Sequence, residues 1–188
     1  MISNKINLRA FIHYKFYNAI FTGLSVGSIF TLYAPLDPSI YPLGGVALAL
    51  TTLFIAKMYT HILNPRYFFR ISLLVELMML VLVSYFLLFS YSYTTALFIY
   101  IGYQLTFSFG SYLVRAETFL IPQKQLLTFL DVTKQKGYLV GMALSYLFYK
   151  ALEQFYNIHT AQEQVYLLHF LLFLSELLTI AYLTKAFK

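Results

Sequence analysis

The 188-residue chain has no cysteine and no tryptophan, and charged residues make up only 11% of it. Without cysteine, the protein has no disulfide, no thiolate metal ligand and no cysteine nucleophile. So few charges cannot cover the surface of a water-soluble domain when 60% of the residues are hydrophobic and the mean hydropathy is +0.71. The composition therefore predicts an integral membrane protein whose first partner is the lipid bilayer.

Motifs that carry enzymatic chemistry are also missing. The four histidines are dispersed without metal-ligand spacing, and the chain has no glycine-rich phosphate loop, no Gly-x-Ser-x-Gly motif and no carboxylate pair with a partner histidine. We expect no enzyme activity, no cofactor and no metal. The formal charge of +6 comes from basic residues between apolar runs rather than from a patch, which indicates membrane topology and not nucleic-acid binding.

The first long apolar run, 16–34, holds 19 residues without a charge. About 20 apolar residues in a helix cross a hydrocarbon core of roughly 30 Å. Lys5, Arg9 and Lys15 precede this run and Pro35 ends it, so its amino-terminal end is expected in the cytoplasm.

The same criterion predicts an all-α membrane domain over residues 1–188 with six transmembrane helices. The predicted spans are 16–34, 41–59, 71–89, 96–114, 137–152 and 165–183. Within the longest connection, 115–136, we expect a short surface helix at 125–131. Twelve of the 13 basic residues then fall on one side and only Lys150 on the other, which places both termini in the cytoplasm and the protein in the plasma (bacterial inner) membrane.

Glycines occur in the first, second, fourth and fifth spans, whereas the third and sixth are rich in leucine and lack glycine. Small residues let helices approach closely, so we expect the glycine-bearing helices to form the interior and the other two to face lipid. The pattern recurs after three helices and suggests two inverted three-helix repeats. The predicted helix-packing residues are Ala19, Gly23, Gly27, Gly45, Ala49, Gly102, Gly110, Gly137 and Gly141.

Three segments resemble the amino-terminal half of major facilitator superfamily transporters. They are Asn18–Tyr33, Pro38–Ala49 and Lys136–Ala143. The connection between the second and third spans keeps two of the basic residues that this family has there, Arg66 and Arg70. It has Asn64 where the family has an acid.

The resemblance implies a half-size transporter, because the family usually has twelve helices. Two copies, or one copy and another six-helix half, would complete the solute cavity, with the second and fifth helices meeting across the dimer through Gly45, Ala49, Gly141 and Ser145. Helices one and four line the cavity in the family, which makes Asn18, Gln104, Ser108 and Tyr112 candidates for binding an unknown small solute. Each could instead form an interhelical hydrogen bond.

Charged residues at or near membrane depth are the other candidates. Glu76 and Glu176 lie within the third and sixth spans, where an acid is costly unless it is paired, protonated or hydrated. They are candidates for proton coupling or for charge pairs with a basic residue near the cytoplasmic end. Arg115 and Glu117 at the end of the fourth span, and Lys57 at the end of the second, are candidates for a cytoplasmic gate or for interfacial anchors.

Two other classes of function remain open on the sequence alone. The chain has the size of the six-helix substrate-binding subunits of energy-coupling-factor importers, which also place small residues at four-residue spacing on the first helix. A membrane scaffold or assembly protein without transport activity is the other alternative.

Overall fold

The computed structural model describes residues 6–89 and 91–188, so Lys5 lies outside the described residues. Every regular element in this part of the chain is a helix. Seven helices build the bundle and one short helix, α3, joins two of them. Their bounds are α1 Leu8–Tyr33, α2 Ile40–Lys57, α3 Tyr59–Ile62, α4 Pro65–Leu88, α5 Tyr93–Ser108, α6 Gly110–Leu120, α7 Lys124–Tyr156 and α8 Ala161–Ala186.

Four segments are long and apolar enough to cross a membrane. They are α2, α4, α5 continued by α6, and α8. This result agrees with the composition in indicating a membrane protein. The first and fifth predicted spans lie within α1 and α7, which are helices of 26 and 33 residues but are not among these four segments.

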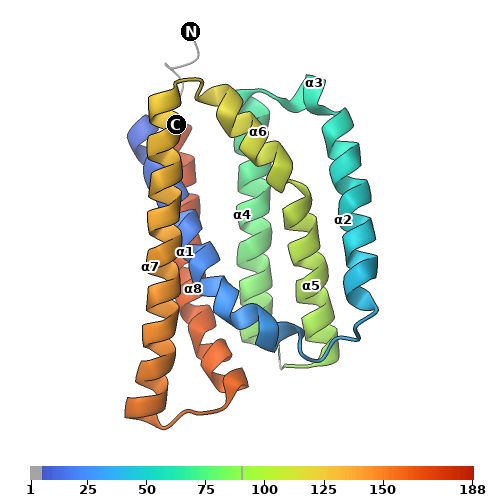
Figure 1. Ribbon diagram of the computed structural model, residues 1–188, viewed down its shortest axis with the longest axis vertical. Helices are drawn as coiled ribbons and strands as arrows, with labels where there is room; N and C mark the ends of the chain where they lie inside the picture. Colours follow the sequence, from blue (N-terminus) through green and yellow to red (C-terminus); the bar gives the residue numbers. More distant parts are fainter. Residues whose placement is uncertain (1–5, 90) are drawn as a thin grey trace.

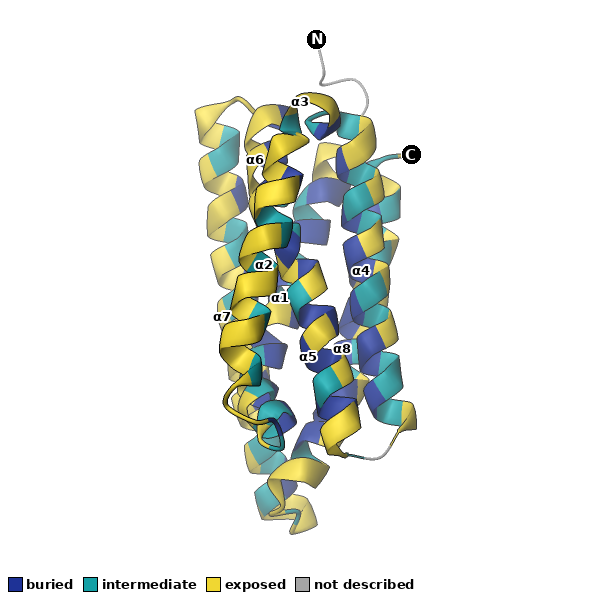
Figure 2. Ribbon diagram, turned by 90° about the vertical axis from the view of Figure 1, so that its right-hand side faces the viewer, coloured by how far each residue is buried: buried dark blue, intermediate teal, exposed yellow. Residues whose placement is uncertain are grey.

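The helices form two layers (Figures 1 and 2). One layer has the order α7, α1, α5 with α6, and α2; the other consists of α8 and α4. The most extensive contacts join α1 to α7 and to α8, followed by those of α4 with α8, α2 with α5, and α4 with α5. The two ends of the described chain meet, because the Asn7 amide donates to the Ala186 carbonyl oxygen at 2.8 Å.

Local sequence explains where several helices begin. Asn7 and Asn64 accept hydrogen bonds through their side chains from the Ala10 and Tyr67 amides, both at 3.1 Å, and Ser92 caps α5 in the same way. Such caps satisfy amides that have no partner within the helix. Asn64 is the residue that stands where the resembled family has an acid, and here it starts α4 together with Pro65.

The fourth predicted span is not one continuous helix. It is interrupted at Phe109, where α5 ends and α6 begins. Just before the interruption, the hydroxyls of Thr106 and Ser108 donate to the carbonyl oxygens of Tyr103 and Gln104. Hydroxyls that bond to the preceding turn of a helix commonly bend it, which gives a physical reason for the break.

The prediction of a separate short surface helix at 125–131 is also wrong. These residues form the first turns of α7, and the connection from α6 shrinks to 121–123, which contains Pro122. Helix α7 ends at Tyr156, and the next residue, Asn157, has a left-handed backbone conformation with φ 54°. An asparagine in this conformation is a common helix terminator.

The expectation that the leucine-rich helices face lipid holds for only one side of each, because α4 and α8 expose residues such as Leu77 and Leu174 but bury their opposite sides. In α8, Leu168, Leu172 and Leu183 are completely buried, and in α4 the side chain of Leu82 fills the space beside Gly102. The glycine-bearing helix α2 is instead the most exposed, with Ile55 as its one buried residue (Figure 2). Leucine fills a protein core as readily as it faces lipid, so leucine content alone does not separate the two environments.

Glycines bring the backbones of α1 and α7 into direct contact. A Cβ atom at Gly141 would lie 3.0 Å from the Cα of Gly23, and one at Gly137 would lie 3.0 Å from the Cβ of Ala19. Gly27 continues this face against Ser145, at 3.2 Å. Gly141 is therefore buried inside the chain and cannot meet a second copy, contrary to the dimer contact inferred from the sequence.

Three other glycines are placed differently. A Cβ atom at Gly102 would meet the side chain of Leu82, whereas one at Gly45 or Gly110 would have no atom of the described residues within 4 Å. Ala49 on α2 is exposed, like Gly45. Gly45 and Ala49 thus make no close helix contact within the described chain.

We predict opposite effects for two glycine-to-alanine substitutions within helices. Gly23→Ala places a methyl group against the backbone of α7 at Tyr138 and Met142, which should lower the free energy of unfolding by about 1–3 kcal/mol. Gly45→Ala has open space and should be neutral or stabilising by about 0.5–1 kcal/mol, because alanine favours the helix. Unfolding of the purified protein in detergent measures both, and equal effects would contradict the close contact.

Candidate functional site

A cavity of about 440 Å³ lies between α1, α4, α5 and α6 and is partly open to the outside. Its apolar wall includes Phe21, Val75 and Met79. Its polar lining comes from five helices and contains two lysines and two glutamates. The polar residues are Tyr14, Lys15, Asn18, Thr22, Ser25, Glu76, Tyr103, Thr106, Glu117 and Lys134.

Glu117 on α6 holds two lysines at one end of this cavity. Its Oε2 lies 2.5 Å from the Nζ of Lys15 on α1, and its Oε1 bonds to the Nζ of Lys134 on α7. Lys134 also pairs with Asp131 at 3.1 Å. Lys15 and Glu117 are only 7% and 3% exposed, so this ion pair joins three helices in a desolvated position.

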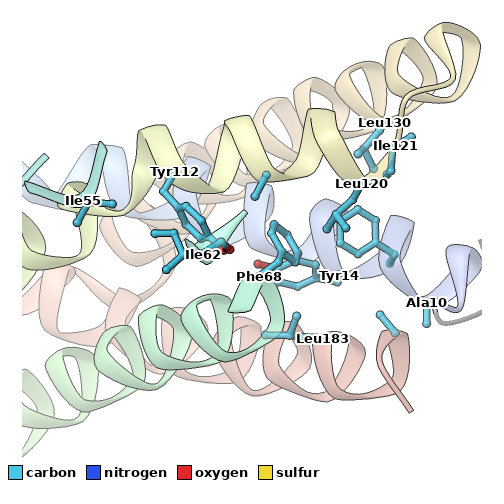
Figure 3. Packing of buried hydrophobic residues seen from close by; sticks show 13 residues of the cluster. Ala10, Tyr14, Ile55, Ile62, Phe68, Tyr112, Leu120, Ile121, Leu130 and Leu183 are labelled. Carbon is cyan, nitrogen blue, oxygen red and sulfur yellow. The ribbon is translucent and has the colours of Figure 1, made fainter. Parts of the chain in front are cut away.

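The ammonium group of Lys15 is also enclosed by aromatic rings. Its Nζ lies 5.6, 5.1 and 5.6 Å from the ring centroids of Phe11, Tyr14 and Phe68. Ring faces attract a cation, and more strongly where water is excluded. Figure 3 shows Tyr14 and Phe68 next to each other between α1 and α4, within the apolar cluster at this end of the bundle.

Glu76 lies near the midpoint of α4 and receives hydrogen bonds from α1. The Tyr14 hydroxyl donates to its Oε1 at 2.8 Å, and the Asn18 amide nitrogen lies 3.1 and 3.3 Å from its two oxygens. The residue is 2% exposed. No lysine or arginine within the described residues forms an ion pair with it, so the predicted charge pair with a basic residue is absent there.

Glu176 on α8 is completely buried beside Glu76. Its exposed fraction is 0%, and neither carboxyl oxygen has a hydrogen-bond partner in the part of the chain that the structure describes. The two carboxyl groups lie close enough to interact electrostatically. The structure thus brings together two acids that lie far apart in the sequence, without a cation between them.

The four predicted solute-binding residues have different positions. Asn18 lines the cavity, but Gln104, Ser108 and Tyr112 are not among its lining residues. Ser108 lies 2.7 Å from the Thr51 hydroxyl of α2, and the Tyr112 hydroxyl donates to the Ile62 carbonyl oxygen at 2.9 Å. Both are interhelical contacts, which is the alternative that the sequence left open.

Of the three predicted gate or anchor residues, one reaches the cavity. Glu117 lines it, whereas Arg115 and Lys57 are exposed and form no ion pair within residues 6–89 and 91–188. Sequence reasoning missed Tyr14, Lys15 and Lys134 as site residues, because it treated both lysines as topology signals only. The available signal was Glu117, since an acid at the end of an apolar helix needs a cation.

The described residues contain no group of three His, Asp or Glu side chains that could hold a metal ion. Comparison with known protein families, with curated proteins and with solved structures finds no match to this chain.

We predict that Glu117→Gln lowers the free energy of unfolding by about 3–5 kcal/mol, because it leaves the buried Lys15 without its carboxylate. Lys15→Met in the same chain should restore part of this loss, since the second substitution removes the uncompensated charge. Thermal unfolding of the two single variants and the double variant measures the coupling. Glu153→Gln is the matched control: Glu153 pairs with Lys150 at 2.6 Å on the surface, and its loss should change little. Additive effects at Lys15 and Glu117 would contradict the prediction.

Proposed function

We propose that this protein is a half-size membrane transporter of small molecules that works as a dimer by alternating access. The observation that supports this proposal most is the partly open cavity of about 440 Å³ between α1 and α5 with α6, whose largely apolar wall also carries polar and charged side chains. Polar groups at membrane depth that meet neither protein nor water cost several kcal/mol each. A second six-helix unit that faces the cavity would close it and leave room for water and a solute.

The pattern of helix contacts supports two inverted three-helix repeats. One repeat would consist of α1, α2 and α4, and the other of α5 with α6, α7 and α8. When each helix is replaced by its counterpart in the other repeat, the contact of α1 with α7 becomes the contact of α5 with α2. The same exchange turns the contact of α1 with α8 into that of α5 with α4, and maps the contact of α4 with α8 onto itself. Inverted repeats of this kind are nested in each six-helix half of major facilitator transporters.

In this proposal α1 and α7 also cross the membrane, which gives six spans and puts both termini on the cytoplasmic side. The basic residues of the chain favour that orientation. Two copies inserted in this same orientation stand parallel, and a two-fold axis along the membrane normal can relate them. The exposed helix α2 and the partly exposed α7 lie at opposite sides of the bundle in Figure 1, with the cavity-lining helices α1, α5 and α6 between them, and we place the contact between copies at α2 and α7.

Cysteine cross-linking tests the dimer, because the chain has no cysteine of its own. Ala49→Cys on α2 and Met142→Cys on α7 lie on exposed faces of the cavity layer, and combining both substitutions in one chain should yield a cross-linked dimer in native membranes. Leu174→Cys on α8 is equally exposed but lies in the other layer, so it should remain monomeric. A cross-link at Leu174 alone, or none at any site, would exclude this interface.

Two-sided labelling tests alternating access without knowledge of the solute. Thr22 is exposed and lines the cavity, so Thr22→Cys should react with a membrane-impermeant thiol reagent added to either side of the membrane. Leu174→Cys faces outward and should react from neither side. Reaction of Thr22→Cys from one side only would favour a binding subunit or scaffold over a transporter.

A further inference from the structure

Glu76 and Glu176 differ from the other three glutamates of the chain. Glu117 is held by two lysines, Glu153 pairs with Lys150, and Glu163 is exposed and accepts a hydrogen bond from the Thr160 hydroxyl at 2.6 Å. Glu76 and Glu176 are buried near the middle of membrane-length helices, and no lysine or arginine of the described residues forms an ion pair with either of them. Another positive partner must therefore balance them, and the simplest one is a proton.

The surroundings of the two carboxyl groups are unequal. Glu76 accepts hydrogen bonds from Tyr14 and Asn18, and these donors stabilise its ionised form. Glu176 has no donor within the described residues and no exposed surface. An ionised carboxylate in that position would be both desolvated and next to a second acid, a combination that disfavours two charges.

We propose that the two residues form a proton-binding site in which Glu176 keeps a proton and Glu76 exchanges one with the cavity. Glu76 is the exchanging member because it lines the cavity, whereas Glu176 does not. On uptake, a hydronium ion in the cavity gives its proton to an oxygen of Glu76 and becomes water; release reverses this transfer. The inference rests on the proposed function and deepens it by naming the proton as the coupling ion.

The groups that face the pair from the neighbouring helices are consistent with this assignment. From α1 they are Tyr14 and Lys15, from α5 Tyr103, and from α6 Glu117. Lys15 is the one cation among them. Its Nζ lies 2.5 Å from Oε2 of Glu117, and the other carboxylate oxygen of Glu117 contacts Lys134 of α7. The positive charge of Lys15 is thus already matched and does not replace a proton on the pair.

Protonation of Glu76 would act on the contact between α4 and α1. The ionised carboxylate accepts from Tyr14 and Asn18 together, and such charge-assisted hydrogen bonds are stronger than neutral ones. A proton on Glu76 therefore weakens the attachment of α1 to α4. Because α1 lines the cavity, proton uptake and the shape of the cavity become linked.

Infrared spectroscopy of the protein in lipid bilayers tests the site through the C=O stretching band of a protonated carboxylic acid. We expect one such band at neutral pH and a second on acidification, both shifted by carbon-13 labelling of glutamate. Glu176→Gln should abolish the neutral-pH band, whereas Glu76→Gln should retain it and abolish the acid-induced one. Glu163→Gln, on the exposed start of α8, should retain both bands.

Several outcomes would overturn the assignment. These are the absence of a protonated glutamate in the labelled wild-type protein at neutral pH, a neutral-pH band that survives Glu176→Gln, and loss of the acid-induced band when sodium is added at constant pH. If Glu176→Gln does not fold, the labelled wild-type protein and Glu76→Gln still decide. The result is independent of transport: two-sided labelling of Thr22→Cys without these bands would refute the proton site alone. Bands without two-sided labelling would refute the proposed function alone.

Discussion

The close approach of α1 and α7 is the contact on which the rest of the bundle depends. Gly23 and Gly141 leave no room for a side chain between the two backbones, and Gly137 against Ala19 repeats this one turn further along. Without a hydrophobic driving force between helices in lipid, such close packing is a main source of association. Helix α7 thus occupies one side of α1. Helix α8 covers a second side, and the third side lines the cavity.

Side chains from the same two turns of α1 make two different electrostatic contacts. Lys15 points to Glu117, where opposite charges are matched and three helices are joined. Tyr14 and Asn18 point to Glu76, where the negative charge has hydrogen-bond donors but no cation within the described residues. A matched ion pair is a stable joint, whereas a carboxylate held by neutral donors can change its charge. In the proposed proton site, the same helix therefore carries a fixed contact and one that can respond to protons.

The sequence predicts the helices well but only part of their arrangement. Apolar runs identify all the long helices, and the four-residue spacing of Gly137, Gly141 and Ser145 marks the side of α7 that packs on α1. Leucine content failed for α4 and α8, because buried and lipid-facing positions both select leucine. The break at Phe109 coincides with hydroxyl hydrogen bonds to the preceding turn, which apolar periodicity does not record.

The sequence identified the acidic residues of the candidate site but not the side chains that contact them. An acid at membrane depth is unusual wherever it occurs, so Glu76, Glu117 and Glu176 stand out from one sequence. Their partners do not stand out. Lys15 and Glu117 are far apart in the sequence, and they meet only because α1 and α6 lie close together in the folded chain. The basic residues served in the sequence as markers of membrane side, and one residue can fulfil both roles.

The position of Glu176 gives a physical reason for burying one side of the leucine-rich helix α8. A carboxyl group near the middle of a lipid-facing helix would be stranded in hydrocarbon, which is costly. Packing α8 between α1 and α4 buries this group beside Glu76 instead. In the proposed proton site, the apolar character of α4 and α8 favours a protonated acid, and the polar side chains of α1 connect it with the cavity. In the proposed transporter, core packing and proton coupling are two consequences of the same pair of helices.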